Sequence, residues 1–116
     1  MKLTTLENQM LVDIYDADML PGMSFEFENY NLTEEDSKEK NQEFASYLAK
    51  LKRLGFIKYE EKEAFLKSGS FSTKYNNNVA MICEDKIHID SEGIKLVDML
   101  EIKEKSINVI KDLVAI

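Results

Sequence analysis

Residues 44–59 read FASYLAKLKRLGFIKY, which predicts an amphipathic helix that ends at a glycine and continues at once as a strand. Apolar side chains recur here at three- and four-residue spacing, as they do on the buried face of a helix. These side chains are Phe44, Tyr47, Leu48, Leu51 and Leu54. Gly55 is suited to the left-handed conformation that closes a helix. The alternation in residues 56–60 then predicts a strand.

A first helix is expected upstream of this segment. Its apolar residues recur at helical spacing, and they are Leu3, Leu6, Met10, Ile14 and Ala17. Thr4 or Thr5, with Glu7 nearby, predicts an N-terminal cap. The helix is expected to end near Met19, because Pro21-Gly22 follows.

The segment between these two helices gives weaker signals. Residues 23–30 alternate apolar and acidic side chains, which predicts either a half-buried strand or an extended segment that covers a sheet edge. Thr33 precedes three acidic residues, a pattern that favours the start of a short second helix. That helix either turns near Ser37 or runs straight into the long helix.

After the long helix, residues 61–85 predict either a short extra helix at 61–67 or an extended hairpin. Turn signals stand at 68–70 and 76–78. Residues 79–83 predict a buried strand, and the alternating residues 86–90 predict another. We expect these strands to form a wing, and a further helix to begin at Asp90 or Ser91.

Length and composition predict one domain that spans residues 1–116. Hydrophobic residues make up 44% and charged residues 32%, which is ordinary for a globular protein. No apolar run approaches the ~20 residues that cross a bilayer, and the N-terminus lacks the apolar core of a signal peptide. A lone Cys83 excludes an internal disulfide and is expected as a small buried side chain. Together these features predict a cytoplasmic protein with no membrane partner.

The net charge of −7 is unevenly distributed along the chain. Residues 1–37 carry −8, residues 38–75 carry +4 and residues 76–116 carry −3. Binding through phosphates requires a basic face, and only the middle third supplies one. Fourteen of the 15 basic residues are lysine. Since arginine is the usual reader of guanine edges, strong base-specific readout is not expected.

Two stretches of the chain resemble signatures of winged helix-turn-helix proteins. Residues 47–57 are similar to the end of a recognition helix with its first wing strand, and residues 87–97 to the last wing strand entering the next helix. The small winged-helix proteins of phages and prophages are nearest in size. The chain departs from the pattern at 32–41, where a second helix is hard to find, and at 61–85, which is longer than a minimal wing.

The resemblance implies an α+β fold, namely a winged helix with three or more helices and a small antiparallel β-sheet or wing. An extra C-terminal helix is expected at 102–116. The function that the resemblance implies is a small DNA-binding transcriptional regulator of phage or prophage type. The alternative is a protein-interaction module, an adaptor or inhibitor, which uses the same scaffold without DNA binding.

The long helix carries small side chains on the face opposite Phe44 and Leu51, at Ala45, Ser46 and Ala49. They allow close approach either of double-stranded DNA or of another helix of the same domain, and both readings stay open. The candidate DNA contacts on the helix and in the wing are Lys38, Gln42, Ser46, Lys52, Arg53, Lys67 and Lys74. For the wing residues, the competing reading is a solvated hairpin tip.

Two further surfaces are candidates for binding proteins. The first is an acidic surface, which is either solvated or imitates phosphates, formed by Glu26, Glu28, Glu34, Glu35 and Asp36. The second is the apolar run at the C-terminus, which is expected to form a homodimer across a two-fold axis or to pack on the first helix of its own chain. Its dimerisation residues are Ile107, Ile110, Leu113 and Val114.

No enzyme activity is expected. His88 is the only histidine, and its position on an alternating strand directs it to solvent. Neither metal-ligand spacing nor a phosphate-binding loop nor a nucleophile elbow is present in the sequence. Neither a metal nor a cofactor is therefore predicted.

Overall fold

The structure is a computed structural model that describes residues 3–100. Three helices, four strands and two 3₁₀ turns (η) follow one another in the order α1 (Thr5–Met19), η1 (Phe27–Asn29), α2 (Ser37–Arg53), β1 (Ile57–Lys58), α3 (Glu61–Ala64), β2 (Phe65–Ser72), β3 (Asn77–Ile82), η2 (Glu84–Lys86) and β4 (His88–Ile89). Residues 91–100 form a further helix. The predicted helix at 102–116 and the dimerisation residues on it lie outside the described residues.

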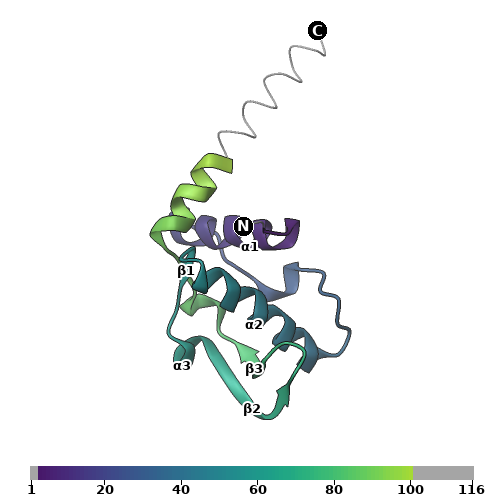
Figure 1. Cartoon of the computed structure of the whole chain (residues 1–116). Coiled ribbons are helices and arrows are strands. Elements are labelled where there is room, and N and C mark those ends of the chain that lie inside the picture. The colour runs from purple at the N-terminus through teal and green to yellow at the C-terminus, as the bar shows by residue number, and fades with distance from the viewer. Residues whose placement is uncertain (1–2, 101–116) are drawn as a thin grey trace, which may run out of the picture.

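Helix α2 is the centre of the fold. Figure 1 shows it between α1 on one side and the β2–β3 hairpin on the other, and both contacts are present. Its side chains at Phe44, Leu48 and Leu51 have no exposed surface. The predicted apolar face of this helix is therefore confirmed, and the described chain has the expected mixed α+β arrangement of helices and small antiparallel sheets.

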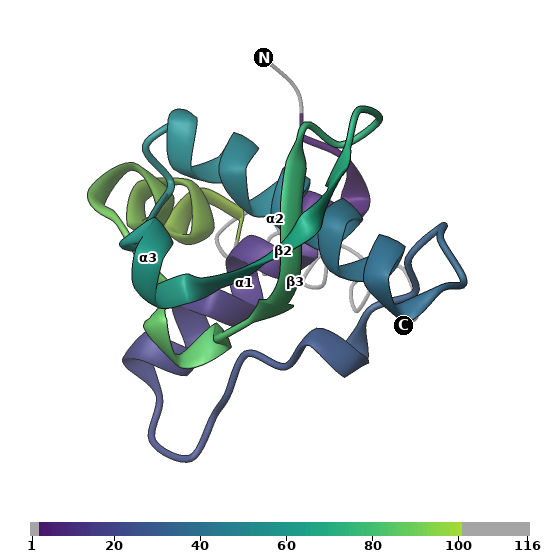
Figure 2. The same ribbon diagram turned by 90° about the horizontal axis from the view of Figure 1, so that it is seen from below.

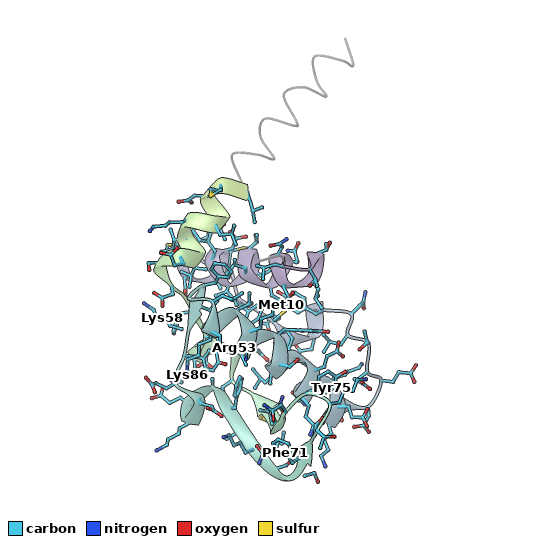
Figure 3. The ribbon with its side chains drawn as sticks, viewed as in Figure 1. Met10, Arg53, Lys58, Phe71, Tyr75 and Lys86 are labelled. Atoms are coloured by element: carbon cyan, nitrogen blue, oxygen red, sulfur yellow. The ribbon has the colours of Figure 1, made fainter. Side chains whose placement is uncertain are left out.

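Helix α1 begins and ends where its sequence predicts. The Glu7 N–H donates to Thr4 Oγ1 over 3.1 Å, and the Thr4 N–H donates to the Glu7 carboxylate over 2.9 Å. The same carboxylate, only 2% exposed, lies 3.0 Å from Lys50 Nζ on α2. This ion pair and the buried Met10, which Figure 3 shows between the two helices, hold α1 against α2.

Of the two alternatives for residues 23–30, the strand is absent and the extended segment is present, with the turn η1. The reason is aromatic packing on α2, since the rings of Phe25, Phe27 and Tyr30 lie 4.8–5.6 Å from that of Phe44. The segment thus covers a helix, and its residues 23–26 also line a hollow together with Ile87 and with His88 of β4.

The predicted short helix that begins at Thr33 is also absent. The backbone N–H groups of Thr33 and Glu34 donate to the Glu43 carboxylate over 3.2 and 3.0 Å, so that side chain holds this segment in a loop. Asp36, and not Thr33, is the N-cap, and it accepts from the N–H groups of Lys38 and Glu39. Helix α2 therefore begins at Ser37.

The end of α2 confirms the expected glycine stop. Gly55 has φ +81°, and its N–H donates to the Lys52 carbonyl over 3.0 Å. The Phe56 N–H donates to the Leu51 carbonyl over 3.0 Å, which completes a Schellman motif. The chain then enters β1, which pairs antiparallel with β4 in the register Ile57↔Ile89.

Both alternatives for residues 61–85 are present, because the short helix α3 is followed by an extended hairpin. Strand β2 pairs with β3 in the register Phe65↔Ile82, with irregularities on either side of Lys67. The predicted strand at 79–83 is only partly buried, since Val79 and Ile82 face α2 while Cys83 is half-exposed. The strands expected to form one wing belong to two separate sheets, β1–β4 and β2–β3.

Candidate nucleic-acid interface

A groove of about 680 Å³ lies between the C-terminal half of α2 and the hairpin. Helix α2 lines it with Ala45, Ser46, Ala49, Lys52 and Arg53. The hairpin and the β1–α3 connection supply Tyr59, Glu61, Phe65, Lys74, Tyr75, Asn76, Asn77 and Val79. Figure 2 shows the hairpin crossing α2. We refer to this feature as the basic groove.

The small residues of α2 pack within the domain. Ala45 of α2 and Val79 of β3 are each only 2% exposed, and both line the groove. The packing partner expected for this face was a helix, whereas the structure places a hairpin there. As a result, this face of α2 cannot enter a DNA major groove while the hairpin covers it.

Gln42, one of the predicted DNA contacts, is buried beneath the hairpin. It is 4% exposed, its Nε2 donates to the Ser70 carbonyl over 3.4 Å, and its own carbonyl accepts from Asn77 Nδ2 over 2.9 Å. Gln42 therefore fastens the hairpin to α2 and is not available for the base contact predicted for it. Ser46 lines the groove, but its hydroxyl donates to the Glu43 carbonyl over 2.5 Å.

Among the described residues, Lys52 and Arg53 are two of the three cations that line the basic groove. Both are exposed, and neither forms an ion pair with an acidic side chain in residues 3–100. Lys52 Nζ lies 4.5 Å from the centre of the Tyr59 ring, a cation–π contact that leaves its charge unneutralised. Burial and the nearby Glu61 raise the pKa of Tyr59 to about 12, so its ring stays uncharged at neutral pH.

The two hairpin lysines are already paired with carboxylates. Lys74 Nζ lies 2.6 Å from Glu34, whose carboxylate also accepts from the Tyr75 hydroxyl over 2.6 Å. These hydrogen bonds raise the pKa of Lys74 to about 12 and lower that of Glu34 to about 2. Lys67 pairs with Glu61 over 2.8 Å. Lys38 lines a different hollow, on the far side of Lys74.

Two further cations lie near this site that are not among the contacts predicted from the sequence. Lys58 on β1 and Lys86 at the end of η2 line a hollow of about 650 Å³ that they share with Lys52 and with the acidic side chains Glu60, Glu63, Asp85 and Asp90. Figure 3 shows Arg53, Lys58 and Lys86 toward the same side of the molecule. Lys58 could have been predicted from the sequence, because it has an exposed position in an alternating strand. Lys86 could not, because it comes close to Lys58 only through the pairing of β1 with β4.

No metal site and no membrane span accompany this groove. In the part of the chain that the structure describes, no three histidine, cysteine or acidic side chains are placed to hold a metal ion. None of its helices has the length and apolarity needed to cross a bilayer. No protein-family model, curated protein or solved structure matches the chain.

Proposed function

We propose that this chain is a small DNA-binding regulator of the winged-helix type, acting in the cytoplasm as phage and prophage regulators do. The observation that carries the proposal is the basic groove, where Lys52 and Arg53 are exposed and have no ion-pair partner within residues 3–100, and where Lys74 stands on the opposite wall. Cations placed along one groove bind phosphates and release counterions, which supplies most of the affinity for duplex DNA. The proposal includes no catalytic activity.

The order of elements supports the winged-helix assignment. A helix, a second helix that ends at Gly55, a short strand, a hairpin and a returning strand follow one another, and β1 pairs with β4. Because the hairpin covers α2, the proposed contact uses the C-terminal end of α2 and the hairpin, not an inserted helix face. Such contacts position a protein on DNA without reading its sequence.

The proposal is tested by measuring binding to a short duplex over a range of salt concentrations, by fluorescence anisotropy. Each phosphate contact contributes a slope of about −0.9 to the plot of log K against log salt, so contacts from Lys52 and Arg53 together give a slope of about −2. Arg53→Glu is expected to weaken binding about tenfold or more at low salt. Lys95→Glu, which makes the same change in charge at an exposed lysine outside the groove, serves as the control.

An absence of binding at low salt, or an equal effect of the two variants, would contradict the proposal. The alternative would then be a protein-interaction module on the same scaffold. The hairpin that covers α2 and the burial of Gln42 favour that alternative, because they remove the helix face with which a duplex is usually read. We further propose a homodimer through Ile107, Ile110, Leu113 and Val114, which lie outside the described residues.

A further inference from the structure

A separate hollow of about 340 Å³ lies where the end of α1 meets residues 23–26 and η2. Phe25 and Ile87 form part of its lining and are only 5% and 3% exposed. Met23, on the same lining, is 51% exposed. None of these residues lines the basic groove. We refer to this feature as the acidic hollow.

Exposed apolar side chains follow the α1 residues that line the acidic hollow. Met19 is 46% and Leu20 49% exposed, directly after Ala17 and Asp18 of its lining. They are joined to Met23 by a turn in which Gly22 has φ +78°. Grouped apolar side chains on a surface mark sites of interaction, and methionine adapts its shape to different partners. This surface is therefore suited to bind an apolar segment.

The charge around the hollow is negative and largely uncompensated. Its lining carries Asp18, Glu26, Glu84 and Asp85. Burial, followed by repulsion from Glu28, Glu26 and Asp85, raises the pKa of Glu84. Within residues 3–100, no lysine or arginine forms an ion pair with Glu26, Glu28, Glu84 or Asp85, and only His88 pairs with Asp18.

We propose that the acidic hollow, with Met19, Leu20 and Met23, binds a lysine- or arginine-bearing apolar peptide segment of a partner protein. Apolar side chains of the segment would cover the exposed methionines and leucine, and its cations would neutralise Glu26, Glu84 and Asp85. The same negative charge repels nucleic acid. This docking surface is separate from the basic groove, so it does not depend on the proposed DNA binding.

The structure also divides the acidic surface that the sequence predicts. Glu26 lines the acidic hollow and Glu28 lies close enough to raise the pKa of Glu84, whereas Glu34 is bound to Lys74 and Tyr75 at the hairpin. Asp36 is occupied as the N-cap of α2. Glu26 and Glu28 are therefore the residues of that surface at the acidic hollow, whereas Glu35 is exposed but does not line it.

The test uses the full chain and an amphipathic peptide of leucine and lysine as the probe. Binding is followed by NMR of methyl-labelled methionines. The methyl signals of Met19 and Met23 are expected to shift as peptide is added. Those of Met81 and Met99, which are 56% and 65% exposed at other sites, are expected to stay in place. The same peptide with glutamate in place of lysine is expected to produce no shift.

Charge-removing variants test the acidic side chains. The double variant Glu26→Gln/Glu84→Gln is expected to weaken peptide binding about fivefold, because two exposed ion pairs are lost. Glu35→Gln/Glu92→Gln removes the same charge elsewhere on the surface and is expected to leave affinity unchanged. The signal of the fully buried Met10 verifies that each variant is folded.

Any of the following results would overturn the proposal. They are no shift at Met19 and Met23, equal shifts at Met81 and Met99, equal weakening by both double variants, or equal binding of the glutamate peptide. A short DNA duplex that shifts Met19 and Met23 would also overturn it, since the surface would then take nucleic acid.

Discussion

At the scale of single residues, Glu43 holds the loop before α2 in place, a role that its position in the sequence does not indicate. It has no exposed surface, yet its carboxylate accepts from the Thr33 and Glu34 N–H groups and from the Tyr47 hydroxyl. Burial raises the pKa of this carboxyl, but the hydrogen bonds from Tyr47, Glu34 and Thr33 outweigh it, so the pKa is lowered. The ionised Glu43 carboxylate thus accepts the hydrogen bonds that backbone carbonyls would otherwise accept from the loop before α2.

Glu43→Gln is therefore expected to destabilise the protein by about 2 kcal/mol at pH 7, since charge-assisted hydrogen bonds are weakened. A folded-state pKa below the unfolded value contributes stability above the ordinary carboxyl pKa of 4.5, and that contribution is lost as pH falls through the lowered pKa. The difference between wild type and variant is thus expected to shrink in acid. Urea unfolding at several pH values measures it, with the exposed Glu35→Gln as control. A difference that grows in acid would contradict the assignment.

Two glycines are required for different reasons. Gly55 needs its φ of +81°, whereas a Cβ added there would meet only the Glu92 side chain at 3.6 Å. At Gly93 a Cβ would lie 2.1 Å from the Phe56 carbonyl oxygen. This close approach allows the helix at 91–100 to pack against Phe56, directly before β1.

We expect Gly55→Ala to cost about 1–2 kcal/mol through backbone strain alone. Gly93→Ala is expected to cost at least about 3 kcal/mol, because backbone must move to relieve the contact. Gly69→Ala, which meets nothing within 4 Å, is expected to change stability by less than about 0.5 kcal/mol. Thermal or urea unfolding of the three variants ranks their losses of stability. A larger loss for Gly55→Ala than for Gly93→Ala would show that the packing at residue 93 is looser.

At the scale of elements, the β2–β3 hairpin is the feature on which the site depends. The side chains of Gln42 and Asn77 hold the hairpin to α2. Glu34, in the loop before α2, holds the hairpin turn through its contact with Lys74. Asn76 has a positive φ of 56° in that turn. The carboxylate of Glu34 thus forms an ion pair with Lys74, the hairpin cation that a phosphate would otherwise contact.

If the basic groove binds DNA, Glu34→Gln is expected to raise the affinity about three- to tenfold at low salt, because Lys74 becomes free for a phosphate. The salt dependence should also steepen by about 0.9, corresponding to one more phosphate contact. Glu35→Gln, at an exposed neighbour, is the matched control in the same anisotropy measurement. Equal or weaker binding by Glu34→Gln would show that this carboxylate positions Lys74 and does not compete for it.

At the scale of the whole molecule, opposite charges are assigned to separate surfaces. The basic groove lies between α2 and the hairpin, and the acidic hollow lies at the end of α1 beside η2. In the lining of the acidic hollow, Asp18 joins α1 to β4, since it accepts from the Ile89 N–H over 2.6 Å and pairs with His88 over 2.9 Å. The exposed position predicted for His88 is confirmed, whereas its carboxylate partner was not foreseen.

The proposed homodimer is also a property of the whole molecule. Size-exclusion chromatography with light scattering is expected to show twice the chain mass of 13.4 kDa at a concentration on the order of tens of micromolar. Leu113→Asp is expected to shift the protein to monomer, because a charge would be buried at the apolar contact. The exposed Glu35→Gln is the control. A wild-type monomer at that concentration would contradict the proposal.

The sequence by itself determined the parts of the fold that rest on neighbouring residues. The capping box at Thr4 and Glu7, the apolar face of α2 and the left-handed Gly55 all act within one or two helical turns, so their spacing is sufficient to predict them.

Only the tertiary structure decided how the segments without strong local preference are placed. Residues 23–36 follow the ring of Phe44 and the buried carboxylate of Glu43, and the hairpin covers Gln42. Each of these contacts joins residues ten or more positions apart, and packing energy there outweighs the weak preference of the local chain. For that reason Lys52 and Arg53 remain exposed groove residues while Gln42 is a structural one.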